Sequence, residues 1–229
     1  ELCIIERNGQ RIRPKIVAST ATVRRADTQI RALFNRRAVD IFPPPGPDRR
    51  NSFFACTLPS TESNARLYVG IAAQGRSPKV AMLRVYLALL GAAQKWHSRL
   101  RKKRETFNPA DPYMTLLGYY NSLRELGGAR RLIEDEIHNR LADYSSRKRV
   151  GEAEGLFDNR QIGYEPVELT SRVNTAQVAD AKRRLALAFT EKSRVDVAIA
   201  TNMISVGLDI TRLGLMVVFG QPKTSAEYI

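Results

Sequence analysis

Two short and almost wholly apolar runs, residues 195–200 and 215–219, restrict the possible folds of this chain more than any other feature. Runs of this kind are typical of parallel strands that helices cover on both faces. Other strand candidates upstream alternate with helical patterns, and such alternation indicates right-handed βαβ units. The sequence therefore predicts an α/β fold with doubly wound parallel sheets.

Hydrophobic periodicity predicts the remaining elements. The other strand candidates are residues 13–18, 67–71, 113–120 and 164–169. Helices are predicted over residues 25–34, from Ser77 onward, and over residues 175–189. The helix after Ser77 has one apolar stripe, formed by Met82, Val85, Tyr86, Leu89, Ala93, Trp96 and Leu100. A further helix is predicted to carry on one face Leu126, Ile133, Ile137 and Leu141.

A proline-rich segment divides the chain. Four of the five residues 43–47 are proline, and proline can neither continue a helix nor occupy a central strand. We therefore place a domain boundary near this segment. The predicted organisation is the end of a first domain over residues 1–45, a linker over 46–65, and a second domain over 66–229.

The net charge of the chain is +14, from 37 Lys and Arg against 23 Asp and Glu. This excess favours a polyanion as partner, because each neutralised phosphate releases condensed counterions. Basic residues cluster at 99–104, 147–149 and 182–184. Any one of these clusters also fits a solvated surface, but their sum favours nucleic acid.

Cysteine usage and hydropathy indicate the compartment. The two cysteines, Cys3 and Cys56, are too few for a disulfide framework and suit a reducing cytosol. No stretch approaches the roughly 18 to 20 apolar residues of a membrane-spanning helix, and the first residues lack the pattern of a signal peptide. We therefore expect a cytoplasmic protein without a membrane partner.

The segment that follows residues 195–200 has the most chemical content. In an open parallel sheet, ligands bind at the carboxyl ends of the strands, and Thr201 and Asn202 are expected there as donors to phosphate oxygens. Gly207 permits close approach of the backbone, and Asp209 can hold a ribose hydroxyl or a basic partner on the nucleotide side. The plainer alternative is an ordinary turn after a strand.

Three further groups of hydroxyl, amide and basic residues follow predicted strands. Small hydroxyl residues after a strand are also common in turns, so each of the three groups has a structural alternative. The first group is Ser19, Thr20 and Thr22; the second is Asn121, Ser122 and Arg124; the third is Thr170, Ser171 and Arg172. The second and third groups are candidate contacts with a nucleic-acid backbone. The second group stands at a predicted helix start, where backbone amides suit phosphate.

A near-match to a nucleotide-binding loop lies at residues 70–77. Its glycines, Gly70 and Gly75, have the spacing of a phosphate-binding loop, but Arg76 replaces the lysine. No Asp-Glu pair follows at a strand end, so a plain turn or a contact with a nucleic-acid phosphate is the preferred interpretation. The two histidines have no zinc-ligand spacing, and we expect neither a metal site nor a catalytic residue within this chain.

Together these segments resemble the core of superfamily 2 helicases. Residues 19–22 resemble motif III with Thr20 inserted, residues 116–124 resemble motif IV, and residues 196–210 resemble motif V. The similarity extends to the helicase subunits of DISARM anti-phage defence systems, most specifically over residues 199–229 and 118–128. The resemblance implies RecA-like folds: the end of the first helicase domain and most of the second.

The resemblance also implies a function. It implies ATP-driven translocation on nucleic acid, DNA rather than RNA, with other defence-system subunits as possible partners. Motif III would couple the nucleotide site to the nucleic-acid site, while motifs IV and V would contact nucleic acid. ATP and Mg²⁺ would be bound mainly by parts outside this chain, so the isolated chain is expected to be inactive. Two alternatives stay open: a non-catalytic nucleic-acid-binding module, and a scaffold of a defence complex.

Overall fold

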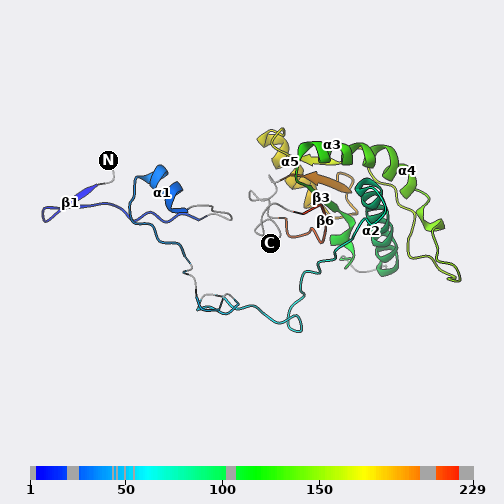
Figure 1. Cartoon of the computed structure of the whole chain (residues 1–229), viewed down its shortest axis with the longest axis horizontal. Coiled ribbons are helices and arrows are strands. Elements are labelled where there is room, and N and C mark those ends of the chain that lie inside the picture. The colour runs from blue at the N-terminus through cyan, green and yellow to red at the C-terminus, as the bar shows by residue number, and fades with distance from the viewer. Residues whose placement is uncertain are drawn as a thin grey trace. The chain divides into compact units, whose positions relative to one another are not determined.

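A computed structural model describes residues 4–19, 26–42, 44, 46–48, 50–53, 55–101, 107–201 and 210–221. The chain divides into two compact units, Glu1–Tyr68 and Val69–Ile229, which Figure 1 draws as ribbons. The second unit contains most of the helices and all strands of the larger sheet. Among the described residues, no helix is both long and apolar enough to cross a bilayer.

The larger sheet has four parallel strands in the order β4-β5-β3-β6. These strands are β3 (Leu116–Tyr120), β4 (Val167–Leu169), β5 (Val197–Ala200) and β6 (Leu215–Phe219). In the pairing register, Gly118 of β3 lies opposite Ile199 on one side and Val217 on the other. Every residue of β3 and β5 is buried, as their near-continuous apolar composition predicts.

Helices cover both faces of this sheet. One face packs against α2 (Pro78–Leu100), α3 (Leu123–Leu132), the π-helical turn η2 (Ile133–Ile137) and α4 (His138–Leu141). The other face packs against α5 (Thr175–Leu185). Alternate residues of each strand enter the two cores: Leu116 and Tyr120 of β3 join the first, and Leu117 joins the second. The predicted α/β fold with a parallel, helix-covered sheet is therefore confirmed.

The buried face was predicted correctly for one helical segment and only partly for another. Leu126, Ile133, Ile137 and Leu141 are all buried, so the predicted face is confirmed across α3, η2 and α4. The stripe predicted for α2 is only partly right, because the core face includes Leu83, Leu87, Leu90 and His97. Trp96 is 53% exposed instead. α2 is apolar around most of its circumference, so periodicity alone could not identify its buried face.

Several element predictions are wrong or too long. Residues 13–18 and 67–71 form no strand, and residues 67–71 are largely exposed. Without a neighbouring strand, an apolar run cannot satisfy its backbone hydrogen bonds as a sheet. The helix predicted over residues 175–189 ends at Leu185, and β4 includes only the last three residues of the predicted 164–169. The strand predicted over residues 113–120 begins only at Leu116, because Asp111–Met114 forms a 3₁₀ helix.

The first unit contains a hairpin that the sequence analysis missed. β1 (Ile5–Arg7) pairs antiparallel with β2 (Gln10–Ile12) through a two-residue turn. Asn8 and Gly9 both have positive φ, 51° and 71°, as the tight hairpin turn requires. The same unit contains α1 (Ala26–Phe34), which agrees with the predicted helix over its described residues.

A pair of tyrosines occupies the centre of the first core. Tyr86 of α2 and Tyr120 of β3 are fully buried, and their hydroxyls are 2.6 Å apart. Burial raises the pKa of Tyr120 to about 12 and that of Tyr86 well above its usual value. Gly118 makes this arrangement possible, because a Cβ at that position would overlap the Tyr86 hydroxyl.

Candidate functional site

Three of the predicted groups share one edge of the sheet. Asn121 follows β3, Thr170 follows β4 and Thr201 follows β5, and all these strands are parallel. Leu169 pairs with Ala200, so Thr170 and Thr201 are the next residues of adjacent strands. The Thr201 amide donates to the Leu169 carbonyl at 3.3 Å. Polar groups separated widely in sequence therefore meet at the carboxyl edge, where open α/β sheets bind their ligands.

The end of β3 is tied to the end of β6. The Asn121 side-chain amide donates to the carbonyls of Phe219, at 3.4 Å, and Gln221, at 3.0 Å. Its Oδ1 is buried and has no hydrogen-bond partner among the described residues. Such an acceptor is costly to leave unpaired. Asn121 therefore holds two strand ends together and presents one acceptor within the edge.

Ser122 starts α3 at this edge. Its hydroxyl accepts a hydrogen bond from the Glu125 amide at 3.2 Å, and a Glu125 carboxylate oxygen accepts one from the Asn121 amide at 3.1 Å. This is the reciprocal pattern of a capped N-terminus, which carries partial positive charge. Arg124 is exposed in the first turn. The start of α3 thus offers a dipole and a guanidinium to an anion.

The end of β4 is more enclosed. Thr170 is fully buried, and its hydroxyl donates to Glu168 at 2.7 Å and accepts from the Arg172 amide at 3.3 Å. A ligand could reach this hydroxyl only by displacing those bonds. Ser171 and Arg172, in contrast, are exposed. Thr170 therefore shapes the turn that presents Arg172, and the exposed neighbours are the ones available to a ligand.

For the remaining predicted site residues, the structure describes only Thr201 and Ser19. Thr201 is described and 7% exposed at the end of β5. Ser19 is exposed in the first unit, without regular structure. The other predicted residues of motifs III and V lie outside the described residues: Thr20, Thr22, Asn202, Gly207 and Asp209.

A groove of about 860 Å³ lies along the start of α5, beside this edge. Its walls include the cations Arg130, Arg172 and Arg184 and the carboxylates of Glu165, Glu168 and Asp180. Arg130 is already 2.8 Å from Glu134 and 3.6 Å from Glu168, and the hydrogen bond with Glu134 raises the pKa of Arg130. Because cations and carboxylates balance, the groove itself is a poor anion site.

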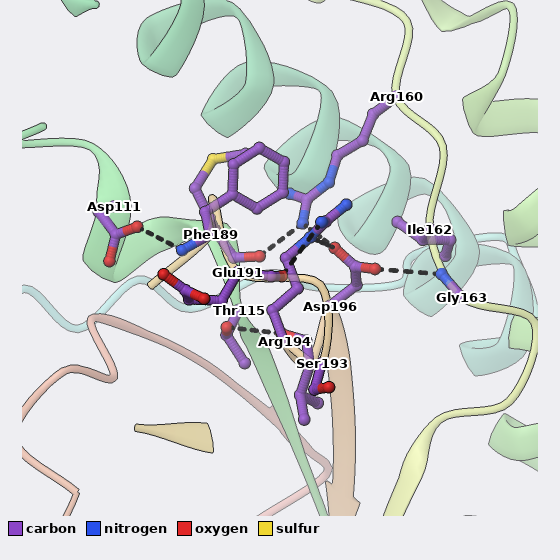
Figure 2. A network of polar contacts seen from close by, with 12 residues as sticks. Asp111, Thr115, Arg160, Ile162, Gly163, Phe189, Glu191, Ser193, Arg194 and Asp196 are labelled. Atoms are coloured by element: carbon purple, nitrogen blue, oxygen red, sulfur yellow. Dashed lines mark hydrogen bonds and ion pairs between the residues drawn. The ribbon is translucent and has the colours of Figure 1, made fainter. Parts of the chain in front are cut away.

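A separate polar network lies at the amino ends of the strands. Asp196, just before β5, accepts from buried Arg160 at 2.9 Å and from the Gly163 amide at 3.1 Å, and Figure 2 shows these contacts. The guanidinium carbon of Arg160 lies 5.1 Å from the centroid of the Phe189 ring, and that of Arg194 lies 4.4 Å from it. Burial lowers the pKa of Arg160, an effect that Asp196 opposes.

This network connects loops to the sheet and is distinct from the carboxyl edge. Asp111 accepts from the Phe189 amide at 2.7 Å and from Arg212 at 2.6 Å, and Thr115 donates to the Val195 carbonyl at 2.7 Å. The sequence pattern does not predict this network, because Arg160 stands in a loop without periodicity. The one available signal was Asp196, a carboxylate at the start of an apolar strand.

The described residues do not form a site for a nucleoside triphosphate and its metal. The loop at residues 70–77 follows no strand, and Gly70 and Gly75 face open space. Ser77 caps α2 by accepting from the Val80 amide at 3.4 Å. In the described part of the chain, no three His, Cys, Asp or Glu side chains gather as metal ligands would.

Comparison with known proteins adds one relative. No family model matches the chain. The chain is 40% identical over all 229 residues to a protein of Bacillus paralicheniformis described as DISARM protein DrmA. It spans 19% of the length of that relative. The similarity therefore concerns one part of a much longer protein.

Proposed function

We propose that this chain forms the nucleic-acid-contacting part of an ATP-dependent DNA helicase or translocase that serves anti-phage defence. The observation that carries the proposal is the convergence of Asn121, Ser122, Arg172 and Thr201 on one carboxyl edge of a parallel sheet. The 40% identity to DISARM protein DrmA supports the setting in defence. The motif resemblance supports motor activity and RecA-like folds.

The exposed groups at the edge suit a sugar-phosphate backbone. The capped start of α3 favours a phosphate through its amides and dipole, and Arg124 adds a full charge. Arg172 lies on the neighbouring turn, which the buried Thr170 hydroxyl braces. Contacts to phosphates position a strand without reading its sequence, so we expect binding with little sequence preference. Grip on a strand of any sequence is what a translocating motor needs.

ATP and Mg²⁺ enter the proposal as ligands of other parts of the protein. The loop at residues 70–77 and the carboxylates described here do not fit them, so we derive no step through them. What this chain would contribute is coupling: Thr201 would contact the nucleic acid at the start of one loop, and Asp209, eight residues later in sequence, would contact the nucleotide side. One loop with two ligands can link their binding free energies. Other DISARM subunits are the proposed protein partners.

The test uses the longest natural protein that contains this chain. We expect Thr201→Ala to weaken DNA binding, by at most about 1.5–3 kcal/mol for a lost hydrogen bond to a charged phosphate. Asp209→Ala should depress DNA-stimulated ATP hydrolysis while nearly preserving DNA affinity. Filter binding and ATPase assays measure both, and Thr190→Ala, an exposed threonine away from the edge, is the matched control.

The two alternatives give other outcomes. DNA binding without any ATP hydrolysis by the long protein would favour the non-catalytic module. Binding of another defence-system protein that does not depend on salt concentration, without DNA binding, would favour the scaffold. Identical profiles of Thr201→Ala and Asp209→Ala, or loss of folding in both, would mean that the loop is only a structural turn.

A further inference from the structure

A basic loop with an apolar tip follows α4 and plays no part in the function proposed above. It runs from Ser145 to Gly155, and we name it the tip loop. Residues 146–154 are exposed, and Val150 is as exposed as an isolated residue, with a relative exposure of 106%. Figure 1 shows this yellow-green segment projecting beyond α4. A branched aliphatic side chain in this position contributes nothing to the core.

The tip is a tight turn with a defined conformation. The Glu152 amide donates to the Arg149 carbonyl at 3.2 Å, closing a four-residue turn. Gly151 has φ +88°, the left-handed conformation that such a turn needs at its third position and that other residues adopt reluctantly. Val150 therefore stands at the apex because of the backbone, and it is not a chance orientation of one side chain.

The base of the tip loop is braced against the helices. The Ser145 amide donates to Asn159 Oδ1 at 2.7 Å, and Lys95 of α2 donates to the Gly155 carbonyl. Gly155 is buried, and a Cβ there would meet the Arg147 carbonyl at 3.2 Å, so the two arms of the loop touch. A braced loop loses little conformational entropy when it binds a partner.

Positive charge surrounds the apex. Arg147, Lys148 and Arg149 are consecutive and exposed, and they precede Val150 directly. Two carboxylates are near: Glu152 is 3.7 Å from Arg149, and Glu154 is 3.7 Å from Lys95. At least one partner of each pair is largely exposed to solvent, and exposed ion pairs contribute little to stability. A competing polyanion could therefore recruit all three cations of the triplet.

We infer that the tip loop is a second nucleic-acid contact, in which the basic triplet binds backbone phosphates and Val150 packs against sugar or base edges in a groove of duplex DNA. Apolar side chains flanked by cations are a recurrent means of groove binding. A membrane is a poorer match, because a single valine buries too few methylene groups to anchor a protein. A protein partner is also a poorer match, because a specific protein interface needs a larger apolar centre.

This contact lies away from the carboxyl edge. α3 starts at that edge and the chain runs through α4 to Leu141, whose carbonyl accepts from the Arg160 amide. Arg160 in turn pairs with Asp196 at the amino end of β5. The tip loop thus belongs to the amino-end side of the sheet, and its role is independent of the edge site.

The experiment measures binding of a fluorescein-labelled duplex DNA to the purified chain by anisotropy, as salt is raised from about 50 to 200 mM. We expect the triple variant Arg147→Ser/Lys148→Ser/Arg149→Ser to lower the slope of log K against log salt by about 2 to 3, near 0.9 for each lost phosphate contact. Val150→Ser should weaken binding several-fold at every salt concentration and leave the slope unchanged. Duplex DNA should also protect Lys148 from acetylation.

The control removes the same three charges elsewhere. Arg84→Ser/Lys192→Ser/Arg131→Ser changes exposed residues of α2, a turn and α3, and its slope should stay within about 1 of the wild type. Equal slopes for the two triple variants would overturn the inference. So would binding to phosphatidylserine vesicles that the tip-loop triple variant loses while its DNA slope is unchanged. Thr201→Ala should weaken DNA binding without altering protection of Lys148. The experiment therefore distinguishes failure of the tip-loop inference from failure of the proposed function.

Discussion

At the scale of single residues, a few positions tolerate no other side chain, because the space around them is filled or because they carry a buried charge. Gly118 admits the Tyr86 hydroxyl into the centre of the sheet, and buried Arg160 forms an ion pair with Asp196. Breaking such a buried pair is far more costly than breaking a surface pair. None of these constraints has a periodic signal, so sequence patterns do not show them.

We predict that Gly118→Ala destabilises the fold by about 1–3 kcal/mol, as overpacking of a filled core does. The added methyl would meet the Tyr86 hydroxyl and Tyr120, and neither side chain has free space. Urea unfolding measures the change. Gly127→Ala is the control, because nothing lies within 4 Å of a Cβ there. That helical substitution should stabilise by about 0.5–1 kcal/mol, and equal effects of both changes would contradict the packing argument.

His97 gives a prediction about pH. Burial lowers its pKa, Arg101 and Arg160 lower it further, and Asp111 opposes them. Because the folded pKa is below the unfolded value of about 6.5, the unfolded chain binds the proton more readily. Stability is therefore full above about pH 6.5 and falls as the pH drops toward the folded pKa.

The measurement is the urea midpoint at several pH values between 7.5 and about 5, across this window. His97→Leu should flatten the profile relative to the wild type. His138→Gln, a change of the other histidine, should keep the wild-type profile because His97 is intact. An unchanged slope in His97→Leu would show that other groups cause the acid sensitivity.

At the scale of elements, the predicted strands are confirmed where the apolar run lies inside the helix-covered parallel sheet. The runs 116–120, 197–200 and 215–219 became strands, because a helix-covered parallel sheet accepts continuous apolar residues. Residues 13–18 and 67–71 were also expected to be strands, but they pair with no strand in the described part of the chain. Phe189 was expected inside a helix, but α5 ends at Leu185, and the Phe189 ring contacts the guanidinium groups of Arg160 and Arg194. Tertiary contacts decided these cases, and a local pattern contains no information about them.

The two serine caps separate a structural role from a binding role. Ser122 caps α3 at the carboxyl edge, and Ser77 caps α2 in the exposed loop. We predict that Ser122→Ala and Ser77→Ala each cost about 1 kcal/mol of stability. Only Ser122→Ala should also weaken DNA binding, because only that helix start belongs to the proposed interface. Unfolding curves and anisotropy on the same samples decide it; equal binding losses would point to a general effect of destabilisation.

At the scale of the whole molecule, the candidate site was predictable in part. Residues 121–124, 170–172 and 201 each follow a strand in the sequence, and the parallel direction of the strands brings them to one edge of the sheet. What could not be predicted was their availability: Thr170 is enclosed by its own hydrogen bonds, whereas Arg172 beside it is free of the core. Topology follows from patterns, but accessibility depends on packing.

The last prediction concerns catalysis by the isolated chain. A triphosphate site needs backbone amides around the phosphates, a lysine, and metal-binding carboxylates. The loop at residues 70–77 follows no strand, has Arg76 in place of the lysine, and is joined by no cluster of acidic residues in the described part of the chain. We therefore expect no ATP turnover above background from the 229-residue chain, measured by phosphate release with and without Mg²⁺ and DNA. Arg76→Ala should change nothing in this assay. Mg²⁺-dependent hydrolysis that Arg76→Ala abolishes would instead make this loop an active site.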